Sequence, residues 1–327
     1  MNHQLNVYAA LFLLGSVACG SNQDPATTAD GSPEGPHPKA YVGLFGEQAV
    51  AVLDTVTSQV SRKIPVTAPD GLIITPDGAK VYVSSVDTGS VKVISTQSDA
   101  IERSIDVGSK PAGLAITPDG SRVVVSVGGA NEAVIVDAST DTIVKHVSVP
   151  AAHAACVSAD GQRAYVASQA TDAPAVVEID LIGDLPVKST PVDKAPRMLS
   201  CTPDRVYFTA VGVDAIEVLD LTTGTLATPI PSGGSPHDVR TSRDGKLELV
   251  VSQTLGDLEL IDPTRDSVVA SVPTGKLAHW ITPLNDGTGA YISNEGDDNL
   301  VIVDFETRRV TKTISIGKAP RKMALQP

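Results

Sequence analysis

A sequence unit of about 42 residues recurs along most of this 327-residue chain. One copy, Lys110–Ser126, holds a short apolar run, an Asp-Gly turn and a second apolar run rich in β-branched residues. This pattern predicts two antiparallel strands joined by a tight hairpin. The turn aspartate recurs at intervals of 40 to 44 residues, at Asp77, Asp119, Asp160, Asp204, Asp244 and Asp286. A repeat of this length is typical of propellers and solenoids.

Two further markers accompany each turn. The strand after the turn carries an aromatic or apolar residue at Tyr41, Tyr82, Val124, Tyr165, Tyr207, Leu249 and Tyr291. The next strand closes with an acidic or hydroxyl residue at Asp54, Ser95, Asp137, Asp180, Asp220, Asp262 and Asp304. With a fourth apolar run, each unit supplies four short strands, which is the size of a propeller blade. Aromatic residues make up only 3% of the chain, so Val, Ile, Leu and Ala must fill the core of an all-β fold.

The two ends of the repeat region predict a closed ring. The region begins at Ala40–Val42, which is the second strand of a unit, and ends at Lys322–Gln326, which is the first strand of a unit. Together they complete one blade, which gives a seven-bladed β-propeller over residues 39–327. A linear β-solenoid, the alternative, has no reason to stop at the complement of its own beginning. Cys201–Arg205, which lacks the turn glycine, and the proline-rich Pro186–Pro196 predict one distorted blade.

The repeats resemble those of the YVTN-family β-propellers. The resemblance covers residues 39–327 and rests on Tyr291–Asn294, Leu300–Asp304, Ile316–Pro320, Val107–Pro111 and Ile116–Gly120. It implies an exported propeller of binding or unknown role, with relatives that resemble lactonases and haem-containing reductases. A Cys-x-x-Cys-His motif, which haem attachment would need, is absent from the sequence.

The N-terminus predicts export and lipidation. Residues 1–19 contain a short apolar run, Val7–Leu14, followed by small residues and Cys19, and Gly15–Cys19 resembles a bacterial lipobox. We therefore expect a cleaved signal peptide, acylation of Cys19, and residence in the cell envelope with the lipid as the membrane contact. Residues 20–38, rich in Ser, Asp, Thr, Gly and Pro, predict a flexible tether.

The charge of the chain narrows the class of partner. The formal net charge is −13, from 38 acidic and 25 basic residues. Nucleic-acid binding requires phosphate neutralisation by Lys and Arg, so we exclude nucleic acid as a general partner. Adsorption on anionic lipid is disfavoured for the same reason.

One position of the repeat concentrates polar side chains. The residue seven before each turn aspartate is predicted to lie in the loop entering the innermost strand, at the mouth of the central channel. In repeat order this position carries Asp70, Ala112, His153, Arg197, His237, His279 and, by extrapolation, Arg321. Three of the six histidines therefore share one ring with two arginines, and we take this ring, without Ala112, as the candidate ligand site.

The residue types leave three interpretations open. Arginines and histidines are suited to a small anion or an acidic group of a peptide or protein partner, because guanidinium and imidazole donate hydrogen bonds to carboxylate and phosphate. His153, His237 and His279 alternatively suggest Zn or Cu, although the arginines raise the cost of placing a cation there. Otherwise the side chains only solvate the rim. We predict no other cofactor.

An enzymatic function is the alternative to a binding scaffold. In a lactonase-like hydrolase, His237 or His279 would act as general base while Arg197 or Arg321 holds an anionic substrate. A metal-dependent lactonase is expected to place Glu, Asn and Asp on the ring, which here has only Asp70, so the sequence favours a binding function without assigned catalytic residues.

Two cysteines, Cys156 and Cys201, lie in the predicted innermost strands of adjacent blades. We expect two buried free thiols, with an export-compatible disulfide as the alternative.

Overall fold

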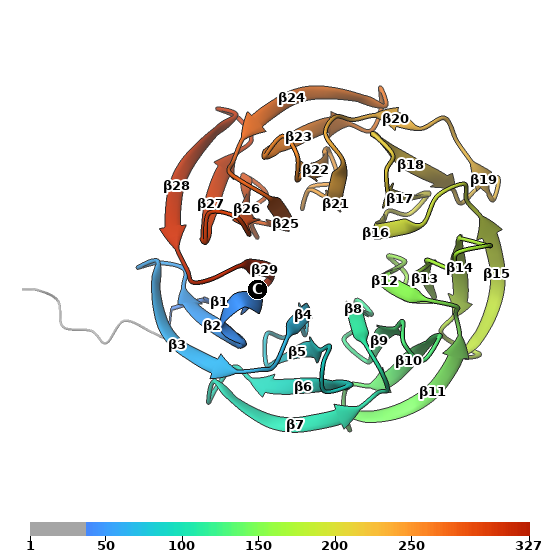
Figure 1. Ribbon diagram of the computed structural model, residues 1–327, viewed down its shortest axis with the longest axis horizontal. Helices are drawn as coiled ribbons and strands as arrows, with labels where there is room; N and C mark the ends of the chain where they lie inside the picture. Colours follow the sequence, from blue (N-terminus) through green and yellow to red (C-terminus); the bar gives the residue numbers. More distant parts are fainter. Residues whose placement is uncertain (1–36) are drawn as a thin grey trace, which may run out of the picture. The chain divides into compact units, whose positions relative to one another are not determined.

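The computed structural model describes residues 37–327, which form seven antiparallel sheets arranged as the blades of a propeller (Figure 1). Blade 1 consists of β29 (Pro320–Leu325), β1 (Lys39–Leu44), β2 (Ala49–Asp54) and β3 (Gln59–Pro65). Blade 2 consists of β4 (Pro69–Ile74), β5 (Lys80–Ser85), β6 (Ser90–Ser95) and β7 (Ala100–Asp106). Blade 3 consists of β8 (Pro111–Ile116), β9 (Arg122–Val127), β10 (Glu132–Asp137) and β11 (Thr142–Ser148).

The remaining blades follow the same order from the channel outward. Blade 4 consists of β12 (Ala152–Val157), β13 (Arg163–Ser168), β14 (Ala175–Asp180) and β15 (Leu185–Pro191). Blade 5 consists of β16 (Pro196–Cys201), β17 (Arg205–Ala210), β18 (Ala215–Asp220), β19 (Thr225–Leu226) and β20 (Ile230–Pro231). Blade 6 consists of β21 (Pro236–Thr241), β22 (Glu248–Ser252), β23 (Asp257–Asp262) and β24 (Ser267–Pro273). Blade 7 consists of β25 (Ala278–Pro283), β26 (Gly289–Asn294), β27 (Asn299–Asp304) and β28 (Arg309–Ser315).

The predicted ring closure is confirmed. The last strand, β29, pairs antiparallel with the first, β1, with Tyr41 opposite Ala324. Figure 1 shows β29 taking the place beside the channel that β4, β8, β12, β16, β21 and β25 occupy in the other blades. A short 3-10 turn, η1 (Phe45–Glu47), follows β1. Among residues 37–327 no helix is long and apolar enough to cross a membrane.

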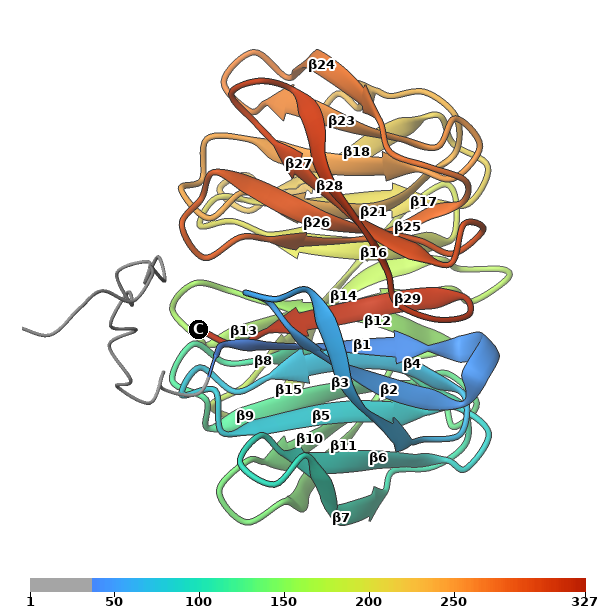
Figure 2. The same cartoon turned by 90° about the vertical axis from the view of Figure 1, so that its left-hand side faces the viewer.

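Apolar clusters between neighbouring blades form the core. Between blades 2 and 3, Tyr82 and Val93 of one sheet pack with Leu114 and Val125 of the next. Because blades stack face to face (Figure 2), both faces of the middle strands are buried, which explains their continuous runs of valine and isoleucine. Each such side chain contributes roughly 1.5–3 kcal/mol on burial.

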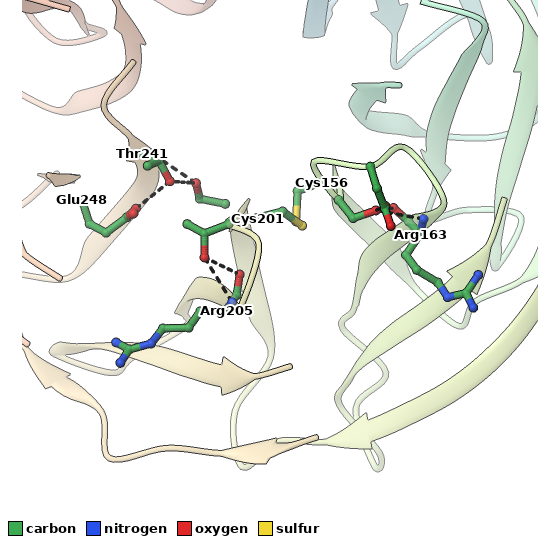
Figure 3. Close-up of a disulfide and its surroundings, with 10 residues drawn as sticks. Cys156, Arg163, Cys201, Arg205, Thr241 and Glu248 are labelled. Carbon is green, nitrogen blue, oxygen red and sulfur yellow. Dashed lines mark hydrogen bonds between the residues drawn. A yellow bond between two sulfur atoms is a disulfide. The ribbon is translucent and has the colours of Figure 1, made fainter. Parts of the chain in front are cut away.

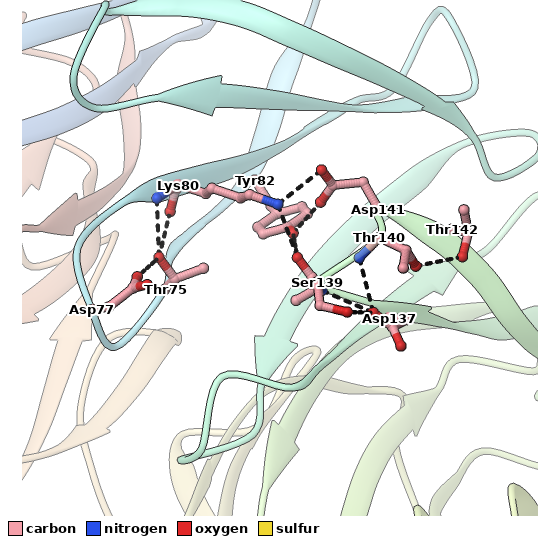
Figure 4. Close-up of polar contacts among 10 residues, drawn as sticks. Thr75, Asp77, Lys80, Tyr82, Asp137, Ser139, Thr140, Asp141 and Thr142 are labelled. Carbon is pink, nitrogen blue, oxygen red and sulfur yellow. Dashed lines mark hydrogen bonds and ion pairs between the residues drawn. The ribbon is translucent and has the colours of Figure 1, made fainter.

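A polar contact also joins neighbouring blades, from the second strand of one blade to the turn between the third and fourth strands of the next (Figure 4). The first residue of β5, Lys80, pairs with Asp141 of blade 3 at 2.9 Å, and the Tyr82 hydroxyl donates to the same carboxylate. Lys39 and Tyr41 contact Asp99 of blade 2 in the same way. The lysine and tyrosine positions of the repeat therefore connect each of these blades to the next one.

The distorted blade is blade 5, but for a different reason than predicted. Pro186 lies in the continuous outer strand β15 of blade 4, so the proline-rich stretch is regular. The outer strand of blade 5 is instead divided into β19 and β20, on either side of Pro229. Pro229, which lacks the N–H group that a sheet ladder uses, lies within this interruption.

Candidate functional site

The ring of polar residues identified in the sequence lies at the beginning of the innermost strands. The sequence pattern predicts the loop before each strand, whereas each member is the second residue of the strand itself. Because the innermost strands of all blades run in the same direction, the seven positions lie at the same end of the channel, which we call the channel mouth. The loops that enter the innermost strands and the turns between the second and third strands form this face.

His237 and His279 are in direct contact at the channel mouth. Their ring centroids are 4.2 Å apart, and Nδ1 of His237 lies 2.9 Å from the carbonyl oxygen of His279. Since that oxygen only accepts, Nδ1 of His237 carries the proton. Burial, followed by the charge of Arg197, lowers the pKa of His237 to about 3. His279 has its pKa lowered by burial and by His237, so both rings are neutral at pH 7.

Arg321 and Asp70 belong to an ion-pair network. The Arg321 guanidinium lies 3.1 Å from Glu295 and 3.8 Å from Asp70, and stacks on the Phe45 ring at 3.6 Å. Burial raises the pKa of Asp70, but Lys322, the largest of the opposing charges, leaves it below its ordinary value. The charges of Arg321 and Asp70 are therefore largely compensated within the protein.

Arg197 and His153 differ from the other members of the ring. Within residues 37–327, neither side chain has a hydrogen bond or an ion-pair partner. Burial lowers the pKa of Arg197, and burial followed by Lys322 lowers the pKa of His153 to about 4. Nδ1 of His279 is also buried, and it too has no hydrogen-bond partner among residues 37–327. Three side chains of the ring thus have unused hydrogen-bonding atoms.

The sequence comparison missed four charged residues of this site, and two of them are basic. Lys322, the third residue of β29, is 2% exposed and lies 3.8 Å from Asp70 and 5.0 Å from the Trp280 ring. Arg240 stacks on the same Trp280 indole at 3.9 Å. The Trp280 ring therefore contacts two cations beside the channel.

Asp238 and Glu295 are the acidic members of this missed group. Asp238 is fully buried, lies 3.2 Å from Arg240, and accepts a hydrogen bond from the backbone N–H of Ile281. Glu295 comes from the turn between β26 and β27 and binds Arg321. Comparing the third and fifth residues of each innermost strand would have identified Lys322, Asp238 and Arg240, but only the fold brings Glu295 to the ring.

The three histidines do not assemble a metal centre. Within the described part of the chain, no group of three or more His, Cys, Asp or Glu side chains is arranged to hold a metal ion. His237 and His279 also commit atoms to each other. The donors at the channel mouth are better suited to an anion than to a cation.

Cys156 and Cys201 form a disulfide, so the expectation of free thiols was wrong (Figure 3). Their Cα atoms are 5.7 Å apart, on the innermost strands of blades 4 and 5. The fifth residue of one innermost strand faces the sixth residue of the next across the blade junction, which the sequence spacing alone did not reveal.

Comparison with known proteins defines the class of this protein as a seven-bladed β-propeller. No protein-family model matches the sequence, and no curated protein matches it. Solved structures do match: hydrazine synthase of Kuenenia stuttgartiensis aligns with a TM-score of 0.73 and 20% identity over 79% of this chain and 90% of that chain. A protein of unknown function from Desulfotomaculum acetoxidans aligns with a TM-score of 0.75 and 16% identity over 88% and 98%.

A third structure is dihydro-heme d1 dehydrogenase NirN in complex with DHE. It aligns with a TM-score of 0.62 and 18% identity over 92% of this chain and 77% of that chain. At these identities the similarity establishes the shared propeller architecture.

Proposed function

We propose that this propeller is a binding protein that holds a small anion, or the acidic group of a peptide or protein partner, at the channel mouth. The observation that supports this most strongly is the half-buried Arg197 guanidinium, which has no partner within residues 37–327. A buried charge without a counterion is costly, and an anionic ligand removes that cost.

The neighbouring side chains suit the same ligand. His153 and Nδ1 of His279 have unused hydrogen-bonding atoms beside Arg197. A bound anion stabilises the protonated form of imidazole, so it raises the pKa of His153 from about 4 toward its ordinary value. Anion binding at pH 5 to 6 should therefore be tighter than at pH 8.

A hydrolytic role for the histidines is less well supported. A general base works best when its pKa is near the operating pH, and the pKa of His237 is about 3. Its Nδ1 atom is also occupied by the His279 carbonyl oxygen. We therefore assign the histidines to ligand binding.

A thermal-shift screen tests the proposed function. The full-length protein and the Arg197→Met variant are each heated with inorganic phosphate, sulfate, acetate, succinate and citrate at pH 6 and pH 8. We expect at least one anion to raise the melting temperature of the wild type by several degrees, more at pH 6, and to have little effect on Arg197→Met. Equal shifts in both proteins with every anion of the panel would refute a site at Arg197.

We further propose that the protein is an exported lipoprotein of the YVTN family. The Cys19 motif supports lipidation but lies outside the described residues, while the Cys156–Cys201 disulfide suits an oxidising compartment. Labelled palmitate should be incorporated into the wild type and not into Cys19→Ser. Incorporation into both proteins, or into neither, would overturn the anchor at Cys19.

A further inference from the structure

The junction between blades 5 and 6 departs from the repeat on the face opposite the channel mouth. At the equivalent place, apolar residues pack between blades 2 and 3, as Ile73 and Ile116 do. Between blades 5 and 6 the pair is Ser200 and Thr241, whose hydroxyl oxygens are 2.9 Å apart. This junction is therefore polar where the junction of blades 2 and 3 is apolar.

A buried glutamate extends this polar junction (Figure 3). Glu248 lies on β22 opposite Thr241, the last residue of the innermost strand. In the other blades the residue in this register is Ala40, Val81, Val123, Ala164, Val206 or Ala290. Glu248 is 1% exposed, and its Oε2 atom accepts a hydrogen bond from the Thr241 hydroxyl at 3.0 Å.

The electrostatic environment keeps this carboxyl group neutral. Burial raises the pKa of Glu248 to about 8, although the Thr241 hydrogen bond and the charge of Arg205 oppose the shift. A carboxyl group that is protonated at pH 7 has one O–H to donate. A buried carboxylic acid is unusual at a position that valine or alanine fills in every other blade.

Glu248 lines a pocket of about 440 Å³ that opens between the two blades. Its lining also includes Arg205, Tyr207 and Arg243. In blade 2 the equivalent tyrosine hydroxyl donates to the next blade, but the Tyr207 hydroxyl accepts from Arg205 at 3.2 Å. Within residues 37–327 the Tyr207 hydroxyl therefore has no acceptor for its own proton.

Several side-chain donors line this pocket. Glu248 and Tyr207 contribute O–H groups. Arg205 uses Nη1 for Asp266 and Tyr207, and Arg243 uses Nη2 for Asn285, so each guanidinium keeps further N–H groups. Asp204, the other carboxyl group of the lining, accepts from the Thr202 hydroxyl at 3.1 Å. A ligand rich in acceptor oxygens complements such a surface.

We propose that the pocket between blades 5 and 6 is a second ligand site, which binds a small carboxylate through a hydrogen bond donated by Glu248. The Tyr207 hydroxyl and the guanidinium groups of Arg205 and Arg243 complete the set of donors. The site lies at the opposite end of the blades from the channel mouth, so it does not depend on the proposed function.

The pH dependence of binding distinguishes this ligand class. The charged and titratable groups facing Glu248 are Arg205 and Tyr207 of β17, Asp204 of the turn before β17, and Arg243 of the turn before β22. As pH rises through about 8, Glu248 ionises and repels a carboxylate. Affinity for the carboxylate should therefore fall about tenfold between pH 7 and pH 9. Affinity for an amine would rise over the same range.

Titration calorimetry of the full-length protein tests the proposal with acetate, succinate, benzoate, inorganic phosphate and putrescine. We expect a carboxylate to bind the wild type with proton uptake at pH 8, and to bind Glu248→Gln with no proton uptake and no dependence on pH. Glu248→Val, which restores the residue of the other blades, should lose binding at least tenfold. Arg197→Met, which removes the proposed anion site at the channel mouth, should keep the Glu248-dependent binding and its fall with pH. The control Lys276→Met, at an exposed cation on the channel-mouth face, should bind this carboxylate as the wild type does.

Four outcomes would overturn the proposal. The first two are tighter binding of putrescine with rising pH and a preference for phosphate over every carboxylate. The other two are an unchanged carboxylate affinity in Glu248→Val and no binding of any probe at 10 mM. A dissociation constant of 10 mM corresponds to roughly 3 kcal/mol of binding free energy. Loss of binding in Arg197→Met with retention in Glu248→Val would assign the carboxylate to the channel mouth instead. Folding of each variant is verified by its urea unfolding transition.

Discussion

Blade 3 keeps the repeat, whereas blades 5 to 7 depart from it and supply three residues of the channel mouth and the pocket between blades 5 and 6. The innermost strand of blade 3 begins with Pro111, Ala112 and Gly113, which offer no side-chain chemistry. The corresponding positions of blades 5 to 7 include Arg197, His237 and His279. The repeated residues build the ring, and the substituted residues supply the chemistry.

The blade junctions repeat this contrast. Lys80 and Tyr82 connect blade 2 to Asp141 of blade 3. At the same two positions blade 6 carries Leu247 and Leu249, so it cannot make this contact with blade 7. The junction of blades 5 and 6, which holds the pocket, is intermediate: Arg205 keeps the repeated ion pair with Asp266, whereas the Tyr207 hydroxyl accepts from Arg205 and does not donate to the next blade.

The largest expected effect concerns Glu248. Its pKa is about 8 in the folded protein and 4.5 in the unfolded chain, so between these values the folded state holds a proton that the unfolded state releases. The contribution of this group to the free energy of unfolding therefore falls by roughly 3–5 kcal/mol as pH rises from 4.5 to 8. Above pH 8 this contribution is constant. Urea unfolding of wild type and Glu248→Gln at pH 5 and pH 8 measures the difference. The same pH slope in both proteins would contradict a neutral buried Glu248.

Removal of the disulfide should have the next largest effect on stability. Cys156 and Cys201 are 45 residues apart, and closing a loop of that length restricts the unfolded chain. Replacing both by alanine should lower the free energy of unfolding by roughly 3–4 kcal/mol. The control is the wild type under reducing conditions, which should unfold at a similar urea concentration. If the double variant is as stable as the oxidised wild type, the bond does not contribute in solution.

A smaller effect compares the two tyrosines directly. Tyr82→Phe removes a hydrogen bond to the Asp141 carboxylate and should cost about 1–2 kcal/mol. Tyr207→Phe removes only an acceptor for Arg205, which keeps its ion pair with Asp266 at 2.7 Å, and should cost less than about 0.5 kcal/mol. Equal losses in urea unfolding would mean that the two junctions do not differ.

Much of the fold was predictable because the repeat carries it. The period, the Asp-Gly turns and the complementary ends at Ala40 and Lys322 are sufficient on their own to indicate a closed ring. The seven second residues of the innermost strands also occupy equivalent places in the fold, as expected for equivalent positions of a repeat, while their role as a ligand site stays a prediction.

The contacts between blades were not predictable in the same way. Cys156 and Cys201 occupy different positions of their strands, and the bond depends on how far one blade is shifted against the next. Glu295 reaches Arg321 from a turn that has no fixed spacing from the innermost strand. Aligned repeats match equivalent positions, whereas these contacts join positions that are not equivalent.

The most direct test of an anion site at Arg197 compares two cations on the channel-mouth face by calorimetry at pH 6. Arg197 is half-buried without a partner within residues 37–327, while Lys276 is exposed beside Asp297 at 3.9 Å. For the anion that stabilises the wild type most, we predict that Arg197→Met weakens binding about 10- to 100-fold and that Lys276→Met changes it less than about twofold. Equal losses in the two variants would show a general surface attraction, and unchanged binding in Arg197→Met would contradict a site built on the residues that depart from the repeat.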